Sequence, residues 1–176
     1  NDTGRDLGLL QLDYWAFDYY GDTNPISDAL RKYLASTRKS ELKFSLVVLP
    51  QAVQATDWPG AAVAHLRDPQ YQTVLGGRPL VYAFAAGSPI TRADMDGLRV
   101  AVRAAGLPDP YIVWMTWDVN DGQTAALGLD AVSAYAHAPT GPIDSVQPYA
   151  NLASVDRASW DAAAAQGLKA VPLATS

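Results

Sequence analysis

The sequence predicts an α/β fold of about six parallel strands with helices outside them, and three observations carry this prediction. Short apolar segments alternate with amphipathic segments along the chain, which is typical of parallel strands joined by helical crossovers. Glycine, proline, asparagine or aspartate separates these segments and gives each one a defined end. The 176 residues are 49% hydrophobic and 18% charged, which indicates a folded domain.

Six apolar segments are predicted to be strands. They are residues 12–20, 43–49, 80–85, 111–117, 128–135 and 168–173. We expect a single domain over residues 1–176, because no low-complexity linker divides the chain.

Four helices are predicted between the strands. The first spans residues 26–36, and the second opens at Trp58. Thr91 is the predicted N-cap of the third, with Asp94 as its capping-box partner and Gly106 at its end. Ser154 or Asp156 is the predicted cap of the fourth, which runs to about Gln166.

Two arrangements of such a sheet stay open, a closed barrel and an open doubly wound sheet. Gly76 and Gly77 precede a predicted strand, whereas a phosphate-binding loop follows a strand and opens a helix. The pattern therefore disfavours a nucleotide site and favours the barrel. A complete barrel of eight βα units typically needs about 250 residues.

Composition excludes several classes of site. The net charge of −5 disfavours nucleic acid and anionic membranes as partners, and no apolar stretch approaches the roughly 18 residues of a membrane span. Cysteine is absent and only two histidines occur, His65 and His137, so we expect no metal site and no cofactor. Because Glu41 is the one glutamate, acid chemistry would have to use aspartate.

Several segments share their order with a known barrel family. The most specific string is Asp-Pro-Gln-Tyr (68–71) followed by Gly-Gly-Arg-Pro and an apolar strand (76–84). Around it lie residues 12–20, 30–36, 43–49, 104–113, 128–139, 148–150 and 168–176. Together they resemble the glycoside hydrolase family 99-like barrels, a group that includes the WbsX-type polysaccharide proteins. The resemblance covers nearly the whole chain.

This resemblance implies a partial (β/α)8 TIM-type barrel of about six βα units that lacks the first and last strands. It implies a secreted protein, extracellular or periplasmic, that hydrolyses O-glycosyl bonds of a polysaccharide or glycan. Gln11 stands where the family usually has glycine. The family's pair of glutamates on its eighth strand has no counterpart, and Glu41 does not match it, so its activity does not transfer residue by residue.

The ligand site of a (β/α) barrel lies at the C-terminal ends of its strands. We expect Asp18 and Asp118 to be catalytic there, because glycoside hydrolysis uses two carboxyl groups about 5–9 Å apart. Aromatic faces suit sugar C–H surfaces, and polar side chains suit hydroxyls. The candidate substrate-binding residues are Tyr20, Trp117, Tyr135, His137 and Tyr149.

Structural roles compete with these assignments. Asp18 could cap a turn around Gly21, which is a common role for aspartate. Asp118 could belong to a solvated turn or to a weak calcium loop, whose pattern residues 118–122 match only in part. His137 could be a solvated loop residue instead of a proton-transfer group.

Three hypotheses about function stay in competition. The chain could be a glycoside hydrolase, a barrel that binds glycans without cutting them, or an incomplete part of a larger secreted hydrolase. Six βα units would leave two open sheet edges, so the third hypothesis predicts self-association or a completing chain at those edges.

Overall fold

The computed structural model describes residues 13–85, 88–137 and 148–172. Its main sheet contains five parallel strands, hydrogen-bonded in chain order. They are β1 (Tyr14–Tyr19), β2 (Lys43–Val48), β4 (Arg78–Phe84), β5 (Tyr111–Thr116) and β6 (Ala131–Ala134). A short strand β3 (Thr73–Val74) pairs antiparallel with β4. The predicted α/β class with a parallel sheet is therefore confirmed.

The sixth predicted parallel strand is reduced to one bridge within the described residues. Ala170 pairs with Val132 of β6 in parallel orientation. The amide of Val132 donates to Lys169 O at 2.9 Å, and the amide of Val171 donates to Val132 O at 2.8 Å. The predicted segment 168–173 thus lies next to β6, in the expected order, and residue 173 lies outside the described residues.

Helical segments fill the connections between the strands. They are η1 (Pro25–Ser27), α2 (Asp28–Leu34), η2 (Lys39–Glu41), α3 (Pro50–Val53), α4 (Gly60–Leu66), α5 (Arg92–Ala104), α6 (Gln123–Ala126) and α7 (Tyr149–Ala165). The helix expected from Trp58 begins at Gly60. β3, α3 and α6 were not predicted, because two to four residues are too few to show a hydrophobic period.

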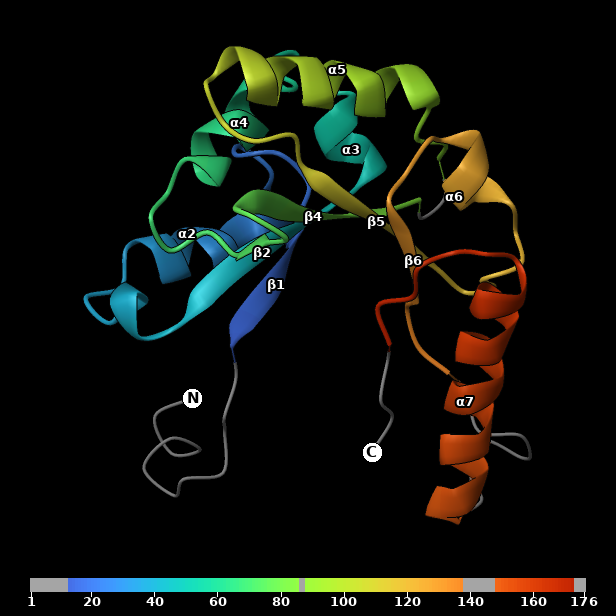
Figure 1. Cartoon of the computed structure of the whole chain (residues 1–176). Helices are drawn as coiled ribbons and strands as arrows, with labels where there is room; N and C mark the ends of the chain where they lie inside the picture. Colours follow the sequence, from blue (N-terminus) through green and yellow to red (C-terminus); the bar gives the residue numbers. More distant parts are fainter. Residues whose placement is uncertain (1–12, 86–87, 138–147, 173–176) are drawn as a thin grey trace.

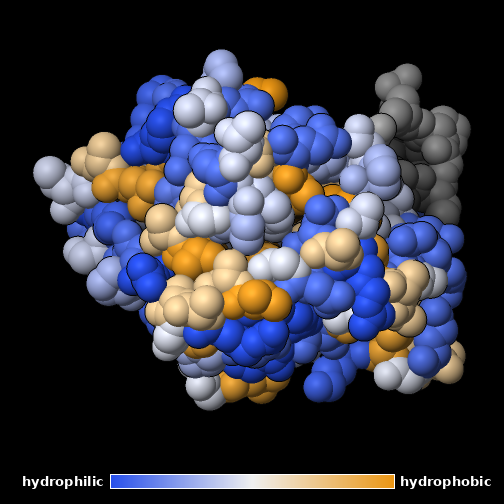
Figure 2. All heavy atoms as spheres, turned by 90° about the horizontal axis from the view of Figure 1, so that it is seen from above, coloured by the Kyte–Doolittle hydropathy of each residue, from blue (hydrophilic) through white to orange (hydrophobic). Residues whose placement is uncertain are grey.

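One face of the sheet carries the helices. Alternate strand residues such as Phe44, Leu46 and Val48 pack there in one cluster with Leu30 of α2, Leu66 of α4 and Leu98 of α5. Figure 1 shows the sheet arching beneath α3, α4 and α5, with α7 beside β6. The outer surface of this layer mixes hydrophilic and apolar residues, as expected where helices meet water (Figure 2).

The opposite face is built by strand residues of the other parity. Its buried members include Val47, Leu80, Tyr82, Tyr111 and Val113, and no residue of a described helix belongs to this cluster. We call this surface the helix-free face. The hydroxyls of Tyr14 and Tyr82 hydrogen-bond across it at 2.7 Å.

The strand order bears on the two arrangements left open by the sequence. A doubly wound sheet reverses its strand order at a switch point and carries helices on both faces. Here the order β1-β2-β4-β5-β6 follows the chain without reversal, and the described helices pack on one face. This is an order consistent with a partial barrel.

The ends of two helices test the predicted caps. Thr91 and Asp94 form the predicted capping box of α5, with Thr91 N donating to Asp94 Oδ2 at 2.8 Å. Gly106 ends that helix with a φ of 78°, a backbone conformation that favours glycine. The predicted cap of α7 is wrong, because the helix already begins at Tyr149. Ser154 lies inside it and donates to Asn151 O at 2.8 Å.

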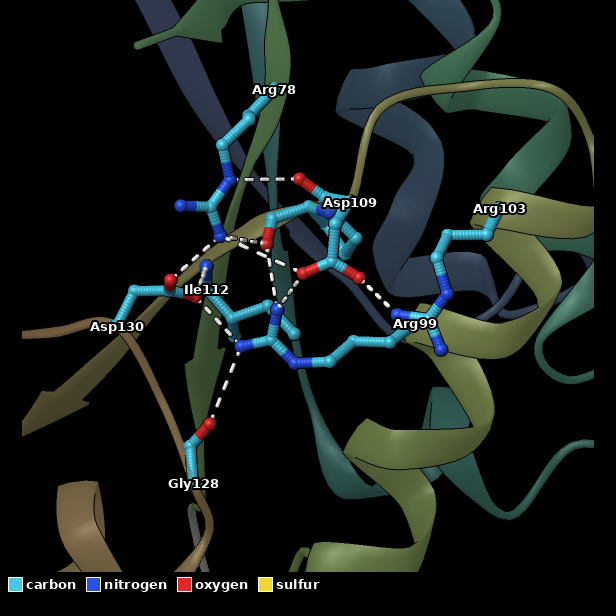
Figure 3. A network of polar contacts seen from close by, with 8 residues as sticks. Arg78, Arg99, Arg103, Asp109, Ile112, Gly128 and Asp130 are labelled. Carbon is cyan, nitrogen blue, oxygen red and sulfur yellow. Dashed lines mark hydrogen bonds and ion pairs between the residues drawn. The ribbon is translucent and has the colours of Figure 1, made fainter.

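An arginine–aspartate network ties together the N-terminal ends of β4, β5 and β6 (Figure 3). Arg78 and Arg99 hold the two oxygens of Asp130 at 2.6 and 2.7 Å. Arg99 also contacts Asp109 at 2.5 Å, and Arg103 pairs with the other oxygen of Asp109. Since the network lies at the edge opposite the C-terminal strand ends, we assign it to stability.

Asp130 is the centre of this network. Partial burial alone would raise its pKa, but hydrogen bonds from Ile112 N, Arg99 and Arg78 outweigh burial and lower the pKa below its ordinary value. The folded protein therefore favours the ionised carboxylate.

Candidate functional site

Three aromatic rings gather at the C-terminal ends of neighbouring strands. Phe84 ends β4, Trp117 follows β5 and Tyr135 follows β6. The Phe84 and Tyr135 rings stack with centroids 4.6 Å apart and planes 6° apart. Trp117 meets Tyr135 edge-on at 4.6 Å and Phe84 at 6.1 Å. We call these three residues the aromatic cluster.

Strand alternation places the cluster on the helix-free face. Phe84 shares the parity of Leu80 and Tyr82, which are buried there. Trp117 lies two residues after Met115, and Tyr135 lies two residues after Ser133, so both continue the same side of their strands. Trp117 is 65% exposed and Tyr135 is 40% exposed, which leaves aromatic surface free for a ligand.

Asp18 lies on the same face at the end of β1, because it shares the parity of Tyr14 and Ala16. Asp18 as a whole residue is exposed to water. Neighbouring atoms nevertheless desolvate its carboxyl group in part, and this raises the pKa of Asp18. Within the described residues, no hydrogen bond or ion pair reaches this carboxylate. The turn after β1 instead uses Asn24, whose Oδ1 accepts from Ile26 N at 3.0 Å. The turn-capping alternative for Asp18 is therefore wrong.

Tyr20 connects β1 to the aromatic cluster. Its pKa is raised first by desolvation and then by the nearby Asp18 and Tyr135. Tyr20 thus lies within electrostatic reach of both Asp18 and Tyr135. The backbone amide of Tyr20 donates to Ser27 Oγ at 3.2 Å, which holds the chain where it leaves β1.

Asp118 has a turn role that the sequence had left open. Its Oδ1 accepts from Asn120 N at 2.9 Å and from Asn120 Nδ2 at 3.0 Å. No described contact joins Asp118 to Asp18. β2 and β4 lie between β1 and β5 in the sheet. The catalytic pairing of these two aspartates stays a prediction.

His137 lies in a groove beside the aromatic cluster. The groove has a volume of about 270 Å³ and is lined by Trp117, Asp118, Val119, Asn120, His137, Val155, Ala158, Ser159 and Ala162. His137 Nδ1 lies 2.6 Å from Asp156 Oδ1 of α7. The His137 side chain is 11% exposed and that of Asp156 is 5% exposed, so His137 is not a solvated loop residue.

α7 forms one wall of this groove and is anchored to the other. Gln166 near its end donates to Asn120 Oδ1 at 2.8 Å. Asp121, which follows Asn120 in the loop after β5, accepts hydrogen bonds from Trp114 Nε1 at 2.8 Å and from Thr116 Oγ1 at 2.7 Å. The loop after β5 therefore has fixed partners on the sheet and on the helix.

Tyr149 lies apart from the other candidates. It is the first residue of α7 and is 69% exposed. It lines a separate hollow of about 470 Å³ that also contains Arg157 and Trp160. None of the cluster residues lines this hollow.

Sequence reasoning missed two residues of the site. Phe84 could have been found, because period-two alternation from Leu80 places it on the same face as the other rings. Asp156 could not, because an aspartate near a predicted helix start reads as a cap, and its partner His137 lies 19 residues away.

Comparison with protein-family models, curated proteins and solved structures found no match to this chain. Among the described residues, no group of three His, Asp or Glu side chains is placed to hold a metal ion. In the same residues, no helix has the length and apolar character needed to cross a membrane.

Proposed function

We propose that this protein is carbohydrate-active, a glycoside hydrolase-like partial (β/α)8 barrel that acts on or binds a polysaccharide or glycan. The observation that carries the proposal is the aromatic cluster of Phe84, Trp117 and Tyr135 at the C-terminal strand ends. Ligand sites of (β/α) barrels lie at this edge.

The chemistry of the cluster suits sugars. Sugar rings have apolar C–H faces and hydroxyl edges, and exposed aromatic faces complement the C–H faces. Tyr20 lies within electrostatic reach of Tyr135 and of Asp18, and Tyr20 and Asp18 supply polar groups for the hydroxyl edges. An aromatic surface with a few polar groups nearby is the usual composition of a small-molecule site.

The barrel interpretation is supported by the unreversed strand order and by the helices on one face. Among the described residues, β1 has a strand partner on one side only. Self-association or a completing chain at this edge belongs to the same proposal and rests on the open edge of the sheet. Secretion of the protein also belongs to it and rests on the family resemblance.

Hydrolysis and binding without cleavage make different demands on Asp18. A glycosidase acid needs a carboxyl group with a raised pKa, and Asp18 has one for the physical reason of partial burial. Binding without cleavage is favoured by the turn role of Asp118, which occupies the second predicted carboxylate. Hydrolysis is the function we put first, because Asp18 has no structural bond in the described residues that would explain its position.

Calorimetric titration and product analysis test this proposal. The panel consists of cello-, xylo-, manno-, galacto- and chito-oligosaccharides. We expect binding to at least one member, a loss of affinity of at least tenfold in Trp117→Ala, and normal affinity in Trp160→Ala. Trp160 is the matched control, because it is a 37% exposed tryptophan outside the cluster. Binding with released product indicates a hydrolase, binding alone indicates a binding module, and no binding contradicts both.

A further inference from the structure

The His137–Asp156 pair is a buried polar arrangement beside the proposed site. A carboxylate that is 5% exposed on a helix is costly unless a hydrogen-bond donor satisfies it. His137 Nδ1 lies 2.6 Å from it. An ionised carboxylate can only accept, so Nδ1 must carry the proton and donate. In its neutral form, an imidazole that donates through Nδ1 has an unprotonated Nε2, which can accept a hydrogen bond.

Of the other polar side chains that line the groove, Asp118 presents an acceptor. Asp118 contributes a carboxylate, while the Nδ2 of Asn120 is already used in donating to it. Asn120 Oδ1 is used in accepting from Gln166. Ser159 adds a hydroxyl that can donate or accept. Among the described residues that line the groove there is no lysine or arginine to pair with an anionic ligand.

The groove is continuous with the aromatic cluster through one residue. Trp117 contacts Phe84 and Tyr135 by its ring and also lines the groove. A ligand that stacks on Trp117 therefore brings its neighbouring unit to His137. The volume of about 270 Å³ lies just below the range for drug-sized ligands and suits a single small ring.

We infer that this groove is a subsite for one neutral, hydroxyl-bearing sugar unit, in which His137 accepts a hydrogen bond through Nε2. Asp156 is the positioning residue that fixes the tautomer of His137. The inference rests on the proposed function, because it places a second sugar unit beside the one at the cluster. It goes further in naming the class of unit, neutral and not a uronic acid.

Asp156→Asn is the sharpest test. The asparagine has the same shape but can donate through its amide, which would move the imidazole proton to Nε2 and turn the acceptor into a donor. We expect nitrogen-15 spectra of the wild-type imidazole to show the proton on Nδ1, and those of Asp156→Asn to show it on Nε2. Asp161→Asn, an exposed change on the same helix, is the control and should resemble wild type.

Affinity supplies the second measurement, with the oligosaccharide that binds best in the panel above. We expect Asp156→Asn to bind it roughly tenfold more weakly, as for loss of one good hydrogen bond. We expect an oligogalacturonide to bind more weakly than its carboxyl-reduced, neutral counterpart. If the wild-type spectrum shows the His137 proton on Nε2, that result alone overturns the inference. Undiminished affinity in a folded Asp156→Asn also overturns it, and leaves the proposed function standing. If the wild-type protein binds no member of the panel, the result contradicts both the subsite inference and the proposed function.

Discussion

Trp117 joins the two halves of the candidate site. Its ring meets Tyr135 at 4.6 Å on the helix-free face and also lines the groove that contains His137. Its 65% exposure means that this position contributes little to folding compared with a buried ring. A large exposed aromatic residue with fixed neighbours is a common anchor for a ligand.

Two isosteric changes separate the roles of the predicted carboxylates. Asp18→Asn removes the charge of a carboxylate with no described hydrogen bond, so we expect turnover to fall by at least 100-fold if the protein is a hydrolase. Asp118→Asn keeps the oxygen that accepts from Asn120, so the turn should persist. Urea unfolding should show both variants within about 0.5 kcal/mol of wild type. Unchanged turnover in both would remove these assignments.

Asp130 should matter for stability and not for ligand binding. Asp130→Asn removes the charge that Arg78 and Arg99 share, and these arginine side chains are only 26% and 13% exposed. We expect the free energy of unfolding to fall by about 2–3 kcal/mol. Asp96→Asn breaks an exposed pair with Arg92 and should cost less than about 0.5 kcal/mol. Equal urea midpoints for the two variants would contradict the assigned role.

The same carboxylate predicts an acid-dependent loss of stability. The pKa of Asp130 is lower in the folded protein than in the unfolded chain, so the unfolded chain binds its proton first. Its stabilisation is full above the unfolded pKa of about 3.9 and is lost as the pH falls through the lower folded pKa. The difference in unfolding free energy between wild type and Asp130→Asn should therefore shrink below about pH 4. A difference that stays constant from pH 7 to 2.5 would argue against this linkage.

At the scale of single elements, the sequence predicts best where local chemistry decides. The cap at Thr91, the end at Gly106 and the cores of five strands were predicted correctly, because neighbouring residues set them. The start of α7 was predicted wrongly: the helix begins at Tyr149 without a side-chain cap, and Asp156 contacts the distant His137 instead. The short elements β3, α3 and α6 carry no period long enough to detect.

The capping box of α5 offers a test at this scale. Thr91→Ala removes the side chain that accepts from Asp94 N at 3.3 Å and disrupts the reciprocal bond. We expect a loss of about 1 kcal/mol in unfolding free energy, measured by urea titration. Val100→Ala, at a 59% exposed position of the same helix, is the control and should change stability by a few tenths of a kcal/mol at most. A Thr91→Ala protein as stable as this control would show that the cap is dispensable.

At the scale of the whole molecule, the alternation of segments was sufficient to predict a parallel α/β sheet. The strand order that the structure adds places Phe84, Trp117 and Tyr135 on adjacent strands, so the candidates Trp117 and Tyr135 form one surface with Phe84. The contacts between the rings depend on the strand register and on the curvature of the sheet, and local sequence patterns predict neither of these. For the same reason the sequence could name Asp18 and Asp118 but could not place them relative to each other.

The central claim is that the aromatic cluster receives the glycan, and one spectrum tests it directly. The chain has five tryptophans, so a proton–nitrogen correlation spectrum contains five indole signals. On titration with the best oligosaccharide of the panel, the Trp117 indole signal should shift, while those of Trp160 on α7 and the buried Trp114 should stay in place. A shift of Trp160 with Trp117 unmoved, or no shift at saturating oligosaccharide, would contradict the account.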